Sequence, residues 1–139
     1  MTNFTKPFAK LTHRGALAII NAAVAQAEDM GIPFCISVVD EGGLLKGFAR
    51  MDGAKFLSIE SSMRKAMTAA SAGNPTGGIS EDVQFKLAHA TDGKLTNLQA
   101  GLPLVADGHL IGGIGVGSGT GEQDLVVAKA GVAAFEAAL

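Results

Sequence analysis

The feature that most constrains the fold is the stretch from Leu102 to Asp124, which reads LPLVADGHLIGGIGVGSGTGEQD. Two short apolar runs, 102–106 and 110–116, flank the pair Asp107-Gly108. Because glycine accepts a positive φ without penalty, Asp-Gly between two apolar runs is a strong β-hairpin signal. Strands joined by a two-residue turn must be antiparallel. The stretch therefore predicts an antiparallel sheet rather than a doubly wound parallel one.

Glycines interrupt the second apolar run, at positions 112, 113 and 115. Glycine weakens a strand, so its repeated use indicates that something lies very close to the strand backbone. A helix, a neighbouring subunit or a flat ligand would each satisfy that requirement. The sequence leaves these three possibilities open.

The glycine loop 117–121 then leads into a helix that ends near the chain terminus. Thr120 and Gln123 have the spacing of a capping box. Such a loop can bind an anion through its free backbone N–H groups, but a tight strand-to-helix turn is the favoured interpretation. Glu122 and Asp124 already place negative charge at the positive helix end. Neither a P-loop nor a G-x-G-x-x-G motif is present, so nucleotide binding by this loop is rejected.

Hydrophobic periodicity and turn residues predict the remaining elements. They are a helix over 13–30, strands over 34–39 and 44–51 joined by the turn 40–43, a helix over 55–72 capped by Asp52, a loop over 73–78, a helix over 81–89 capped by Ser80, and an extended piece over 94–99. This order places the chain in the α+β class, with a central antiparallel sheet of about five strands and helices packed against it. Residues 1–10 are predicted to be a loose arm, and 11–139 a single domain.

The predicted helix over 55–72 carries two different stripes. The first is apolar and contains Phe56, Ile59, Met63, Ala66 and Ala70. The second is small and polar apart from one lysine, and contains Ser58, Ser62, Lys65 and Ala69.

Composition bounds the class of protein. The chain has 139 residues, is 47% hydrophobic and only 17% charged, and so is not disordered. The net charge of −2 argues against a nucleic-acid partner. A single cysteine, Cys35, excludes an internal disulfide and a zinc-finger arrangement. The weakly charged, apolar composition favours a homo-oligomer.

The N-terminal region admits two interpretations. Basic residues precede an apolar run over 15–24 and small residues follow it, so residues 6–27 resemble an export signal. The same residues form an amphipathic pattern with Thr12 as a start signal and Gly31 as a stop signal. The structural helix, and with it a cytoplasmic protein, is favoured. No apolar stretch reaches the roughly 20 residues that span a membrane.

Two long runs resemble the GlcG/HbpS family. They are VVDEGGLLKGFARMDGAKFLSIESSMRKAMTAA and LPLVADGHLIGGIGVGSGTGEQDLVVAKAG. The resemblance implies a profilin-like fold and a homo-oligomer, commonly an octamer. The family includes the haem-binding HbpS, GlcG, and the C-terminal domain of PduO-type proteins, which binds haem or cobalamin. The segment NPTGGISEDVQFKLAHATDG replaces a longer, often proline-rich connection in other members.

Candidate axial ligands for a haem iron are few, since the chain has three histidines and no tyrosine. His13 is the leading candidate for the metal ligand, because the PduO-type domain uses a histidine near its start. His89, His109, Cys35 and the methionines are the alternatives. For each histidine a role as a solvated or structural residue competes with ligation.

Arg50 and Lys65 are the cations inside the most family-like segments. If both faced the loop Gly117-Ser118-Gly119, they would form a pocket for a carboxylate or for a haem propionate. Structural salt bridges, for instance Arg50 with Asp52 or Asp124, are the competing explanation.

Two classes of function follow. The first is a small-ligand-binding protein that takes haem or a cobalamin as an oligomer, without membrane or nucleic-acid partners. The second is a small enzyme, of tautomerase or hydrolase type, that acts on a carboxylate metabolite. Asp40, Glu122 and Asp124 would be its candidate acids or bases. No catalytic triad or Cys-His unit is evident, so the binding protein is favoured.

Overall fold

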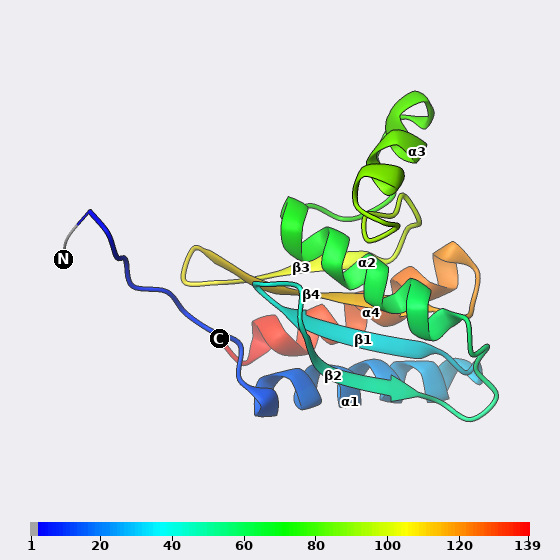
Figure 1. Ribbon diagram of the computed structural model, residues 1–139. Coiled ribbons are helices and arrows are strands. Elements are labelled where there is room, and N and C mark those ends of the chain that lie inside the picture. Colours follow the sequence, from blue (N-terminus) through cyan, green and yellow to red (C-terminus); the bar gives the residue numbers. More distant parts are fainter. Residues whose placement is uncertain (1–2) are drawn as a thin grey trace.

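The computed structural model describes residues 3–139 as four helices and one four-stranded sheet (Figure 1). In chain order the elements are α1 (His13–Met30), β1 (Cys35–Asp40), β2 (Leu45–Arg50), α2 (Ser58–Ala72), α3 (Glu81–Ala90), β3 (Gly101–Ala106), β4 (His109–Gly117) and α4 (Gly121–Ala137). The α+β class is confirmed. Of the predicted arm 1–10, the first two residues lie outside the described range.

The sheet has the strand order β2-β1-β4-β3, and every neighbouring pair is antiparallel. Both predicted hairpins form. Asp107 and Gly108 have φ of 51° and 73°, the two positive values that a type I′ turn requires. In the other hairpin Asp40 Oδ1 accepts hydrogen bonds from the N–H groups of Gly42 and Leu44. The turn chemistry therefore sets the register of each strand pair.

Helix α2 covers one face of the sheet and lies directly on the glycine strand β4 (Figure 1). A Cβ at Gly113 would overlap the carbonyl oxygen of Ala66, and a Cβ at Gly115 would overlap that of Ser62. These alternate glycines thus let a helix backbone meet a strand backbone. Of the three possibilities raised by the sequence, the helix is the one found.

Helices α1 and α4 cover the opposite face and enclose the main core. Thr12 caps α1 through its hydroxyl, and Gly31 ends it with φ of 70°. Five residues of α1 are buried against the sheet and α4, namely Ala16, Ile19, Ile20, Ala23 and Ala27. Residues 13–30 therefore form an amphipathic helix whose apolar side is part of the core, as the hydrophobic pattern predicted.

The sheet-facing side of α2 includes the small polar stripe. Ser58, Ser62, Lys65 and Ala69 are all buried, whereas Phe56 is 71% exposed. The hydroxyls of Ser62 and Ser37 form a buried hydrogen bond of 2.8 Å across the α2–β1 contact. Small residues are needed here because the glycine strand brings the two backbones so close.

Three details of the prediction were wrong. The sheet has four strands rather than about five, because residues 94–99 form no strand. Helix α2 begins at Ser58 rather than near Lys55, and its N-cap is Leu57 rather than Asp52. Residues 52–53 and 56–57 form turns before the helix, so Asp52 lies too far upstream to cap it.

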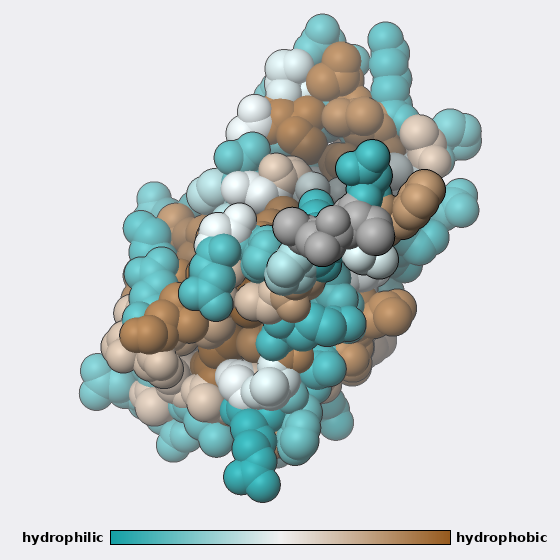
Figure 2. All heavy atoms as spheres, turned by 90° about the vertical axis from the view of Figure 1, so that its left-hand side faces the viewer, coloured by the Kyte–Doolittle hydropathy of each residue, from teal (hydrophilic) through white to brown (hydrophobic). Residues whose placement is uncertain are grey.

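Helix α3 projects away from the sheet on the segment between α2 and β3 (Figure 1). None of its residues is buried, and Phe85 is 77% exposed. Figure 2 shows apolar side chains gathered at this end of the molecule. Leu98, on the return to β3, is 56% exposed and adds to the apolar surface of this segment.

Candidate functional site

The glycine loop is held in place by the first turn of α4. The Thr120 hydroxyl accepts from the Gln123 N–H, and the Gln123 side chain accepts from the Thr120 N–H, which completes the predicted capping box. Asp124 Oδ1 accepts a hydrogen bond of 2.9 Å from the Gly119 N–H. The Asp124 carboxylate, one of the two acidic groups noted at this helix end, therefore helps to hold the glycine loop in place.

Lys65 reaches this loop from α2. Its Nζ atom lies 3.1 Å from Asp124 Oδ2 and 2.7 Å from the carbonyl oxygen of Val116. Lys65 and Asp124 are 4% and 3% exposed, so the pair is withdrawn from water. An unpaired charge would be costly here, so each residue compensates the other.

A small cavity of about 250 Å³ opens beside this ion pair. Lys65, Ser118 and Gly119 line it, together with Lys55, Ser58, Ser61, Leu98, Gln99, Gly121 and Asp124. The Ser118 hydroxyl accepts a hydrogen bond from the Lys55 N–H and joins the loop to the start of α2. Three of the predicted site residues therefore meet in one place.

Gly117 and Arg50 lie at the same end of the sheet. Gly117 faces α2, where a Cβ would come within 2.9 Å of the Ser61 hydroxyl. Arg50 pairs with Cys35 from one side and Gly117 pairs with it from the other, so they are two strand spacings, about 10 Å, apart. Arg50 is exposed and does not line the small cavity.

His13 lies at the opposite end of the sheet. It is the first residue of α1, which has 18 residues and is therefore about 27 Å long. The helix ends just before β1 begins beside Gly117. Within one protomer, His13 and the glycine loop therefore do not contribute to a single site. The His13 side chain is exposed.

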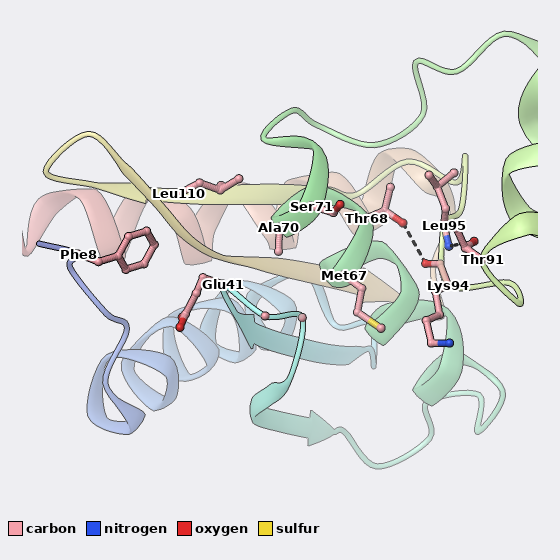
Figure 3. Close-up of a pocket in the computed structure, with 12 residues that line it drawn as sticks. Phe8, Glu41, Met67, Thr68, Ala70, Ser71, Thr91, Lys94, Leu95 and Leu110 are labelled. Carbon is pink, nitrogen blue, oxygen red and sulfur yellow. Dashed lines mark hydrogen bonds between the residues drawn. The ribbon is translucent and has the colours of Figure 1, made fainter. Parts of the chain in front are cut away.

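A larger cavity of about 650 Å³ lies near the C-terminal end of α2 (Figure 3). Its apolar lining comes from four separate segments of the chain and includes Phe8, Met67, Leu95 and Leu110. Lys94 and Glu41 supply charges at its edge. On its polar side, the Thr68 hydroxyl donates to the carbonyl oxygen of Lys94. The sequence did not predict this cavity, because its walls meet only through tertiary contacts.

The N-terminal arm forms one wall of this cavity. Phe8 packs against the His109 ring with centroids 4.7 Å apart, and the Ala9 N–H donates to His109 Nδ1. Lys10 forms a 2.8 Å ion pair with Glu41 Oε1. This hydrogen bond holds the pKa of the Glu41 carboxyl below its usual value and raises the pKa of Lys10. Glu41 Oε2 is buried without a hydrogen-bond partner among the described residues.

The other candidate metal donors are dispersed. His89 is exposed on α3. Cys35 is buried, its thiol donates to the carbonyl oxygen of Lys55, and burial raises its pKa, which suits an unreactive core thiol. Within residues 3–139 no three His, Cys, Asp or Glu side chains are grouped to hold a metal ion. In the same range no helix combines the length and the hydropathy of a membrane span.

Comparison with known proteins gives a consistent result. The family model described as haem degrading protein HbpS-like matches residues 11–133. Protein GlcG of Escherichia coli (strain K12) is 40% identical over 107 residues, which cover 76% of this chain and 80% of GlcG.

Two solved structures extend the match to nearly the whole fold. The Klebsiella pneumoniae protein ORFY has a TM-score of 0.92 at 29% identity, covering 99% of this chain and 98% of ORFY. The PduOC:haem complex has a TM-score of 0.83 at 32% identity, covering 91% of this chain and 95% of PduOC. With the matching motifs and topology, these similarities show that the chain belongs to the HbpS-like family, the GlcG/HbpS family that its sequence resembles.

Proposed function

We propose that the protein binds a tetrapyrrole, haem or a cobalamin, in the larger cavity. The observation that carries this proposal is the cavity itself, about 650 Å³ with apolar walls and a few charged groups at its edge. Cofactor sites typically measure about 300–1,000 Å³ and have this composition. A relative of 32% identity, PduOC, has been solved with haem bound, which supports the ligand class.

The residues present fit the chemical parts of a haem. Phe8, Leu95 and Leu110 offer apolar surface for the macrocycle. Lys94 offers a cation for a propionate. Met67 offers a thioether sulfur, a known axial donor for haem iron. Bound haem would supply iron redox chemistry, and the chain's own residues would exclude water from it.

The small cavity suits a tetrapyrrole less well. At about 250 Å³ it is below the usual range for cofactor sites, and the Lys65 charge is already paired with Asp124. His13 remains the proposed ligand for a neighbouring protomer's haem, since its ring is exposed and histidine is a common haem ligand. Substituting Met67 and substituting His13 therefore test the two proposed iron ligands separately.

We also propose a cytoplasmic homo-oligomer, an octamer by resemblance to the family. The exposed apolar side chains on α3 and at Phe56 and Leu57, just before α2, support association. The use of residues 13–30 as a core helix and the single buried thiol support a cytoplasmic location.

The test is a titration with haem followed by the Soret absorption band, with cobalamin as a competitor. Met67→Leu should remove or shift the band of the bound form, whereas Met63→Leu on the same helix, outside the cavity, should leave it unchanged. Ser71→Trp should fill the cavity and weaken binding, and Ala72→Trp is its matched control. His13→Ala, compared with His89→Ala, tests the ligand from a neighbouring protomer.

The outcomes separate the parts of the proposal. Binding that survives both Met67→Leu and His13→Ala would retain the cavity and reject both donors. Binding unaffected by Ser71→Trp would reject the cavity. The absence of any spectral change with haem or cobalamin would reject the tetrapyrrole altogether.

A further inference from the structure

The small cavity beside the Lys65–Asp124 pair has features that the tetrapyrrole proposal does not use. It lies where α2 begins and where β4 leads through the glycine loop into α4. Its lining contains two lysines and one aspartate, so its formal charge is positive. This surplus of one positive charge favours an anionic ligand.

Lys65 retains an unused hydrogen-bond donor. A lysine ammonium has three N–H groups. One donates to Asp124 Oδ2 and one to the Val116 carbonyl oxygen, and Lys65 makes no third hydrogen bond within residues 3–139. Since Lys65 lines the cavity and is only 4% exposed, a ligand there would meet a desolvated, positioned N–H donor.

Two hydroxyl groups add to this donor set. Ser58 and Ser61 lie three residues apart on α2, and Ser61 lies four residues before Lys65, so all three occupy one helix face. Neither hydroxyl makes a hydrogen bond within the described chain, although Ser58 is 8% exposed. The missing side chain at Gly117 lets the strand backbone lie close to both serines, since a Cβ there would come within 2.9 Å of the Ser61 hydroxyl.

The charge pattern favours a carboxylate over a phosphate. Glu122 and Asp124 stand in the first turn of α4, at the helix end that would otherwise attract a multiply charged anion. A singly charged carboxylate would meet less repulsion there than a dianion. Leu98 adds apolar surface for a short carbon chain.

We propose that this cavity binds the carboxylate group of a small aliphatic acid, through the free N–H of Lys65 and the hydroxyls of Ser58 and Ser61. The inference is independent of the tetrapyrrole site, because the two cavities share no lining residue. No reaction is proposed at this site. Its expected ligand is defined by a single negative charge and a small size.

Nuclear magnetic resonance of the ¹⁵N-labelled protein, free of haem, tests the site. Titration with sodium propionate should shift the amide signals of Gly119 and Gly121, which line the cavity, in a saturable manner. Propionamide has the same shape without the charge and should cause no such shift. Sodium chloride at equal concentration controls for ionic strength.

Two serine variants test the proposed contacts while leaving the buried Lys65–Asp124 ion pair intact. Ser61→Ala should weaken propionate binding about tenfold, since a hydrogen bond to a charged group is lost. Ser71→Ala, on the same helix but outside this cavity, should leave the affinity unchanged. Equal shifts with propionamide, no saturable shift, or an affinity unaltered by Ser61→Ala would each overturn the proposal. None of these results would affect the haem titration.

Discussion

Lys65 on α2 and Asp124 on α4 form a 3.1 Å ion pair, although 59 residues separate them in the sequence. Both side chains are almost wholly buried. The same aspartate accepts from the Gly119 N–H, and the same ammonium donates to the carbonyl oxygen of Val116 near the end of strand β4. One pair of residues thus fixes the helix, the strand and the glycine loop that surround the small cavity.

The first prediction concerns this pair. Lys65→Met should lower the free energy of unfolding by about 3–5 kcal/mol, because Asp124 would remain buried and uncompensated. Asp124→Asn should cost a similar amount, because it leaves the ammonium unpaired. Urea denaturation at a fixed protein concentration measures both losses.

The double variant provides the control for that prediction. Lys65→Met combined with Asp124→Asn removes both charges, so its loss should be clearly smaller than the sum of the single losses. Strictly additive losses would mean that the two residues do not depend on each other.

The second prediction concerns the glycine face of β4. Gly115→Ala should destabilise the protein by about 3 kcal/mol or more, because the new methyl group would overlap the backbone of α2. Gly78→Ala is the matched control, since a Cβ there meets nothing within 4 Å. Thermal unfolding of the two variants compares them, and equal stability of both would contradict the close contact.

The elements that could be predicted from the sequence are those set by local chemistry. The Asp107-Gly108 turn, the Asp40 turn, the Thr120 capping box and the limits of α1 depend on neighbouring residues alone. Such interactions act within a few residues, so their sequence patterns identify them directly.

The parts that could not be predicted depend on tertiary contacts. The apolar stripe of α2 suggested one buried face, but the glycine strand contacts Ala66 and Ala70 of that stripe as well as the small polar stripe, and Phe56 is exposed. Lys65 lies beside the glycine loop, but its partner Asp124 was not identified from the sequence. The larger cavity combines Phe8, Met67 and Leu110 from distant segments, and no local pattern marks that combination.

The third prediction concerns the pH dependence of the arm. The Lys10 hydrogen bond lowers the pKa of Glu41 in the folded protein. A lowered folded-state pKa means that the pair stabilises the fold above the unfolded value, about 4.3, and that this contribution is lost as pH falls through the folded value. Lys10→Ala should therefore move the Glu41 titration upward, toward the usual range of a glutamate.

Carbon-13 detection of the Glu41 carboxyl follows this titration residue by residue. Lys6→Ala removes an arm lysine that has no ion pair with Glu41 and should leave the midpoint unchanged. If Lys10→Ala also left the midpoint unchanged, the arm would not be anchored through this pair in solution.

The last prediction concerns assembly through the segment that carries α3. Phe85 and Leu98 are 77% and 56% exposed, and burying large apolar side chains between protomers would stabilise an oligomer by about 1.5–3 kcal/mol each. Light scattering should give a mass several times the protomer's 14.1 kDa. Phe85→Asp with Leu98→Asp should reduce that mass, because charges would be buried at the contact. Lys86→Asp, on the same exposed helix, changes charge without removing apolar surface and should preserve the assembly. A wild-type mass of one protomer would reject the oligomer, and an unchanged assembly in the double variant would place the contact elsewhere on the molecule.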